Sequence, residues 1–156
     1  MTHRDPLHRT GPSLLVDPLA LAAVALMVLN DRWLKPTLHN ELTGKLSDIA
    51  VCFFFPLFLA EVGMPLARWF GSRAVLWAGA VVAAALYTTL ELSIPISRWA
   101  CGCLAHVGPW VGIHGRFVMT RDLSDLWSLI MIVFALAWGE QRIAAHERNG
   151  ASHAAL

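Results

Sequence analysis

The sequence predicts an all-α membrane protein: a bundle of four transmembrane helices with a short interfacial helix in the third loop. Of the 156 residues, 56% are hydrophobic and 15% are charged, whereas a typical soluble domain is about 45–50% hydrophobic and about 25% charged. The apolar residues also collect in four stretches, each close to the ~20 residues that a helix needs to cross a bilayer. A chain with so little charge is therefore expected to lie in the lipid bilayer.

The charge balance and the length exclude other classes. The 12 basic and 11 acidic residues leave a net charge of +1, so no nucleic-acid partner is expected, because phosphate contacts need a basic excess. The high apolar content excludes a disordered chain. Four crossings of ~20 residues would occupy about half of the chain. No room remains for a soluble catalytic domain.

Local signals set the expected helix ends. Asp17 followed by Pro18 is typical of an N-cap and a first helical position, and no cleavage site follows this apolar run, so we expect an uncleaved anchor. Pro56 lies inside the second stretch and should bend that helix. The predicted transmembrane domain spans residues 14–142 between an N-terminal tail of residues 1–13 and a C-terminal tail of residues 143–156, with helices over residues 14–34, 47–66, 74–94 and 123–139.

Two further features concern packing and the membrane surface. Gly79 with Ala83 and Ala80 with Ala84 form small-residue pairs at a spacing that allows membrane helices to approach closely. Pro95 could begin a short amphipathic helix that ends at Gly108, lying in the headgroup region. The seven tryptophans fall mostly near predicted helix ends, as an aromatic belt would place them.

With four crossings, both termini lie on one side of the membrane. Each side then carries six basic residues, so the positive-inside rule gives a tie. Several basic residues of the side away from the termini have acidic neighbours, for example Arg32 beside Asp31. Counting only the unpaired basic residues favours cytoplasmic termini.

The candidate site is a polar pocket at the membrane boundary opposite the termini. An up-down bundle brings the starts of the second and fourth helices and the end of the third to this boundary. Basic groups would hold a phosphate, and carboxylates would orient them or act in acid–base chemistry. Most of these acids also suit a helix N-terminus, but Glu91 lies in an apolar run at a C-terminal end, where the helix dipole disfavours it. The candidate ligand-binding residues are Lys45, Asp48, Glu91, Arg116, Asp122 and Asp125.

No cofactor is expected. All seven histidines lie outside the predicted spans, which excludes haem held between helices, and no Gly-rich phosphate loop or metalloprotease motif is present. Thiolate and imidazole groups in the long loop are suitable ligands for zinc or copper, but their spacing is not an established zinc pattern. No metal site is therefore assigned to these residues, which are Cys101, Cys103, His106 and His114.

The order of the polar residues resembles the VanZ-like family of small bacterial membrane proteins. Lys45 matches the family's lysine at the start of the second helix, although Asp48 stands where the family has histidine, and Glu91 matches its glutamate at the end of the third. The family's arginine and aspartate before the last helix correspond to Arg116 or Arg121 and to Asp122 or Asp125; Ser128 is the nearest polar residue to the family's asparagine in that helix. The segment from Thr43 to Asp48 also resembles a second, poorly described group of small bacterial membrane proteins. The VanZ-like resemblance implies a role at the cell envelope and places the chain in the bacterial inner membrane.

Three functional hypotheses remain open. The first is a multi-pass membrane protein whose interfacial pocket binds the headgroup of a lipid or an envelope precursor. The second is a small membrane enzyme that acts on lipid phosphates, using the Asp122 and Asp125 pair. The third is a non-catalytic subunit of a membrane complex, in which the small residues around Gly79 face another membrane protein.

Overall fold

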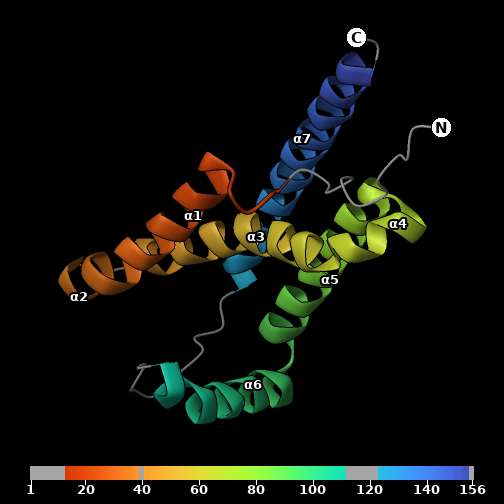
Figure 1. Cartoon of the computed structure of the whole chain (residues 1–156). Helices are drawn as coiled ribbons and strands as arrows, with labels where there is room; N and C mark the ends of the chain where they lie inside the picture. Colours follow the sequence, from red (N-terminus) through yellow and green to blue (C-terminus); the bar gives the residue numbers. More distant parts are fainter. Residues whose placement is uncertain (1–12, 39–40, 112–122, 155–156) are drawn as a thin grey trace.

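The computed structural model describes residues 13–38, 41–111 and 123–154, and all regular structure within these ranges is helical. The all-α prediction is thus confirmed. Figure 1 shows the arrangement of the longer helices, and short 3₁₀ turns lie at Met64–Leu66, Gly108–Val111 and Leu123–Leu129. The α-helices are α1 (Pro18–Leu29), α2 (Lys35–Leu38), α3 (Glu41–Gly63), α4 (Ala67–Phe70), α5 (Ser72–Leu92), α6 (Ile94–Val107) and α7 (Ile130–Ala154), with a π-helical turn at Asn30–Leu34 joining α1 to α2.

Three helical stretches are long and apolar enough to cross a membrane: Thr43–Phe70, Ser72–Leu92 and Ser124–Ser152. They correspond to the second, third and fourth predicted spans. The first predicted span is not among them, because α1 has only 12 residues and the helix continues through charged residues, such as Asp31 and Arg32. Many large apolar side chains are exposed on the long helices, as contact with lipid would allow and contact with water would not.

Two helices extend beyond their predicted bounds. The second predicted helix was placed at residues 47–66, but α3 begins at Glu41, so Asp48 lies within the helix rather than in its first turn. The predicted C-terminal tail of residues 143–156 is helical as far as Ala154. In both places the added residues are rich in Glu, Leu, Lys, Ala and Arg, which have high helix propensity and extend a helix after its apolar run has ended.

The short helix in the third loop is present as α6. Pro95 lies in its first turn and Gly108 is its C-cap residue, as the sequence predicts. Figure 1 shows α6 lying across the end of α5, rather than continuing its direction.

The core of the protein is built around α3, which packs against α1, α5 and α7. The backbones of α3 and α5 approach closely at Gly79 of α5, where an added Cβ would lie 2.9 Å from the backbone nitrogen of Ala60 and 2.9 Å from the carbonyl oxygen of Pro56. Ala80 and Ala83 of α5 are also buried, each 2% exposed. Gly79, Ala80 and Ala83 therefore pack within the chain, against α3 and its neighbours.

Polar contacts fasten the start of the described chain to α3 and α7. The Asp17 side chain, 1% exposed, accepts hydrogen bonds from the Leu19 N–H (2.9 Å) and the Trp138 Nε1 (3.0 Å). Its other carboxylate oxygen lies 2.8 Å from the Nε of Arg142. The Leu14 N–H donates to Glu61 Oε2 at 2.7 Å. Asp17 is thus the predicted N-cap and also holds α7.

The start of α5 is joined to α7 at the same end of the molecule. Arg73 forms ion pairs with Glu140 (3.4 Å) and Glu147 (3.0 Å), and the Trp77 Nε1 donates to Glu140 at 3.0 Å. We call this end, marked by Asp17, Glu61, Arg73 and Arg142, the terminal end.

The Gly79 contact gives a stability prediction. We expect Gly79→Ala to lower the free energy of unfolding by about 1–3 kcal/mol, because the new Cβ would collide with backbone atoms of α3, which cannot rotate away. Thermal unfolding in detergent, followed by circular dichroism, measures this change.

Gly44→Ala is the matched control, since Gly44 lies inside α3 with no atom within 4 Å of an added Cβ. It should raise the stability by about 0.4–1 kcal/mol by reducing the freedom of the unfolded chain. Equal effects of the two substitutions would contradict the close approach of α3 and α5.

Candidate functional site

Three of the predicted site residues come together at the end of the molecule opposite the terminal end. Asp48 belongs to α3, Glu91 to the last turn of α5 and Asp125 to the 3₁₀ turn before α7. Asp48 and Asp125 interact electrostatically with each other. Tyr87 of α5 interacts with both Asp48 and Glu91. We call the region that contains Asp48, Glu91 and Asp125 the acidic end.

Tyr87 joins the helices at the acidic end. Its hydroxyl donates a hydrogen bond to the backbone carbonyl of Asp125 at 3.2 Å, and it is also hydrogen-bonded to Ser128. Ser128 is 5% exposed. These bonds hold the Asp125 backbone against α5. Ser128 takes part in them, although the sequence marks it only as the nearest polar residue to the asparagine of the VanZ-like family.

Glu91 is buried, with 5% of its surface exposed. It lies two residues before Ser93, the C-cap residue of α5, where the carbonyl end of the helix repels a carboxylate. A buried acid at this position is costly, and ionisable groups in membrane helices are usually retained for a function. The structure thus keeps Glu91 as the strongest of the candidates from the sequence.

A buried network around Asn30 fastens the first helix to α3, and the sequence analysis missed it. Asn30 is 0% exposed, and its Nδ2 donates to the Thr43 carbonyl and to the Ser47 Oγ (2.7 Å). The Ser47 hydroxyl in turn donates to Asp31 Oδ1 at 2.9 Å, and Asp31 lies 2.7 Å from the Nζ of Lys35. The signal in the sequence is an asparagine directly after an apolar run, since a polar side chain that is buried there needs hydrogen-bond partners.

The structure brings Lys35, in addition to the predicted Lys45, to the elements that form the site. Lys45 is half-buried and takes part in none of the ion pairs found in the described part of the chain. The lysine that interacts with Asp48 is Lys35. The reason is the earlier start of α3 and the helical continuation of the first apolar stretch, which carry Lys35 to this end of the molecule. Arg116 and Asp122 lie outside the described residues.

The thiol and imidazole groups of Cys101, Cys103 and His106 do not form a metal centre within the described residues. Cys101 and Cys103 are free thiols on α6, and two residues apart on a helix they point in different directions. The His106 ring is instead hydrogen-bonded to the Gly102 carbonyl, with Nδ1 2.8 Å from the oxygen. Within the described ranges, no three His, Cys, Asp or Glu side chains form a group that could hold a metal ion, and His114 lies outside these ranges.

Comparisons with known proteins add no family. No family model, curated protein or solved structure matches the chain. The functional argument therefore starts from the charges and contacts of the chain itself.

The Asn30 network gives a second stability prediction. We expect Asn30→Ala to destabilise the protein by about 1–2 kcal/mol, since it removes a buried side chain that makes two hydrogen bonds to α3. The readout is thermal unfolding in detergent.

The exposed Asn149 of α7 provides the control, and Asn149→Ala should change stability by less than about 0.5 kcal/mol. If both alanine variants unfold at the same temperature as the unmodified protein, the Asn30 network does not hold the first helix in place.

Proposed function

We propose that the chain is a membrane protein with four crossings, whose acidic end binds the headgroup of a zwitterionic phospholipid at the membrane surface. The observation that supports this function is the convergence of Asp48, Glu91 and Asp125 from three separate helical elements. The ammonium group of the headgroup would lie against the carboxylates. Binding, rather than catalysis, is the proposed activity.

Contacts between the first helix and α3 support the fourth crossing. Leu14 contacts Glu61 near one end of α3, and Asn30 contacts Thr43 near the other. The chain from residue 14 to residue 30 therefore runs along α3 for the distance between residues 61 and 43, which is about 27 Å at 1.5 Å per residue. This distance is close to the ~30 Å hydrocarbon core of a bilayer.

The balance of charge favours a zwitterionic over an anionic headgroup. The sequence predicts basic residues that hold a phosphate, but the described groups that interact with Asp48 are two further acids, Asp31 and Asp125, and one base, Lys35. Such a surface attracts an amine more strongly than a phosphate.

Lys45 still gives the phosphate a binding partner. It lies three residues before Asp48 on α3, so the two side chains share one face of the helix. An ammonium group on Asp48 would leave the phosphate of the same headgroup within reach of Lys45. A phosphatidylethanolamine headgroup, in which a two-carbon linker separates the charges, fits this arrangement.

The position of α6 supports a membrane boundary at the acidic end. One face of α6 carries exposed apolar side chains, including Ile96, Leu104 and Val107. The helix lies across the end of α5, directly after Glu91 in the chain (Figure 1). A helix with an apolar face lies in the interface plane, with that face in the lipid.

The topology can be tested by labelling single cysteines in whole cells, using a chain whose own cysteines are replaced. Cysteines at Lys45 and Arg98 should react from one side of the membrane, and cysteines at Arg68 and Asn149 from the cytoplasmic side. A cysteine at Ser13 decides the fourth crossing. It should react from the same side as Arg68, whereas labelling from the side of Lys45 would contradict the crossing.

The lipid preference can be tested by native mass spectrometry of the purified protein in detergent with phosphatidylethanolamine and phosphatidylglycerol. We expect Asp48→Asn to weaken phosphatidylethanolamine binding about five- to tenfold, as expected for the loss of a charge-assisted contact of about 1–1.4 kcal/mol. Binding of phosphatidylglycerol should stay unchanged.

Glu147→Gln is the control for this substitution, since Glu147 is an exposed carboxylate at the terminal end. It should bind phosphatidylethanolamine within about twofold of the unmodified protein. Unchanged phosphatidylethanolamine binding in the Asp48→Asn variant, or a parallel loss of both lipids, would rule out the proposed headgroup site.

A further inference from the structure

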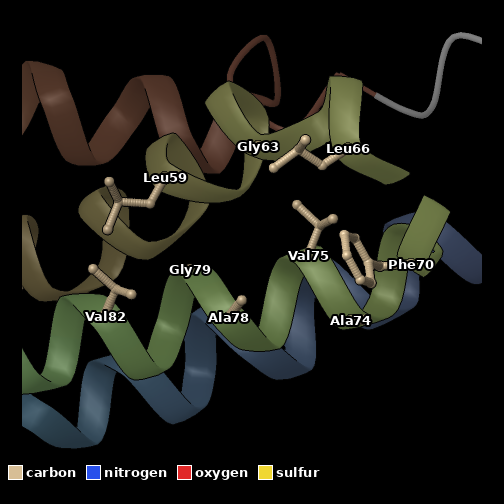
Figure 2. Close-up of a pocket in the computed structure, with 9 residues that line it drawn as sticks. All are labelled: Leu59, Gly63, Leu66, Phe70, Ala74, Val75, Ala78, Gly79 and Val82. Atoms are coloured by element: carbon tan, nitrogen blue, oxygen red, sulfur yellow. The ribbon is translucent and has the colours of Figure 1, made fainter. Parts of the chain in front are cut away.

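An open apolar groove lies between α3 and α5 near the terminal end. Its volume is about 480 Å³, within the range of ~300–1,000 Å³ that is typical of ligand pockets. Figure 2 shows the groove bounded by α3 and the following turn on one side and by α5 on the other, with Phe70 at one end. The lining residues are Leu59, Gly63, Leu66, Phe70, Ala74, Val75, Ala78, Gly79 and Val82.

The groove occupies only one half of the membrane-spanning length. Along α5 it extends from Ala74 to Val82, which is about 12 Å at 1.5 Å per residue. It thus begins near the start of α5 and ends near the middle of that helix. This length is close to the depth of one leaflet, about half of the ~30 Å hydrocarbon core.

Exposed cationic and aromatic groups lie on α4, the short helix that carries the lining residue Phe70. The guanidinium group of Arg68 in this helix is 5.4 Å from the ring centroid of Trp69. Arg68 forms no ion pair with any residue in the described ranges. Arg73, by contrast, is engaged by Glu140 and Glu147. Arg68 is therefore a cation on the helix beside the groove that is not paired with any acid in the described ranges.

We propose that this groove binds one acyl chain of an anionic phospholipid, whose phosphate group contacts Arg68. The two parts of such a lipid match the two parts of the site: an apolar groove about one leaflet deep, and a cation on the helix beside it. A transmembrane helix of a second protein would need a contact surface that extends over both leaflets. The groove is too short for such a helix, because it ends near the middle of α5. The site is separate from the acidic end and does not depend on the function proposed there.

Native mass spectrometry with dioleoyl-phosphatidylglycerol and dioleoyl-phosphatidylcholine tests both parts of the proposal. Ala78→Leu places a larger side chain in the groove, since Ala78 is exposed and lines it. This variant should lose both lipids to the level of nonspecific adducts. Arg68→Gln should weaken phosphatidylglycerol binding about fivefold, which corresponds to ~1 kcal/mol for one basic group at a membrane surface. It should weaken phosphatidylcholine binding less, because the choline ammonium offsets the charge of that lipid's phosphate. Arg68→Lys, which keeps the charge, should retain most of the affinity.

Ala85→Leu is the matched control, because Ala85 is exposed on the same face of α5, two turns beyond Ala78 and outside the groove. It should bind both lipids like the unmodified protein. Equal lipid binding by the Ala78→Leu and Ala85→Leu variants would overturn the proposal. So would a dimer of the unmodified protein that Ala78→Leu dissociates, because the groove would then be occupied by a second copy. Asp48→Asn should leave phosphatidylglycerol binding intact, which separates this site from the acidic end.

Discussion

The contact between α3 and α5 at Gly79 is the constraint on which the rest of the structure depends. Because the backbone of α3 fills the space of a side chain at this position, the two helices lie close enough for Ala80 and Ala83 to be buried. Lipid provides no hydrophobic driving force between helices, so such close packing has to supply the attraction. The same two helices line the apolar groove, and Gly63 and Gly79 are among its lining residues.

Charged side chains lie at the terminal end and at the acidic end of the molecule. The two ends differ in how their acidic residues are paired with basic residues. At the terminal end, acids are paired with bases: Asp17 with Arg142, and Arg73 with Glu140 and Glu147. These pairs fasten α5, α7 and the start of the chain together. At the acidic end, Asp48 interacts with two further acids, Asp31 and Asp125, and with Lys35, which also pairs with Asp31. Like charges that are held together destabilise a fold, and this cost is the basis of the headgroup site proposed there.

The sequence predicted features that depend on neighbouring residues. Asp17 and Pro18 start α1, and Pro95 and Gly108 bound α6, because caps and prolines act within one turn of the chain. Glu91 was recognisable as a site candidate because its position conflicts with both the helix dipole and the apolar run around it. The lengths of α3 and α7 were underestimated, since hydrophobicity marks where a helix meets lipid and not where the helix ends.

The features that the sequence could not predict depend on residues far apart in the chain. Trp138 and Arg142 contact Asp17 across more than 100 residues, and Asn30 reaches Thr43 only because the first helix lies along α3. The charge around Asp48 depends on such contacts as well. Lys45 lies three residues before Asp48 in the sequence. The base that acts on Asp48 is nevertheless Lys35, and Asp31 and Asp125 add negative charge beside it. Spacing along one helix predicts Lys45 beside Asp48, whereas the packing of the first helix and the 3₁₀ turn against α3 adds Asp31, Lys35 and Asp125 to that surface.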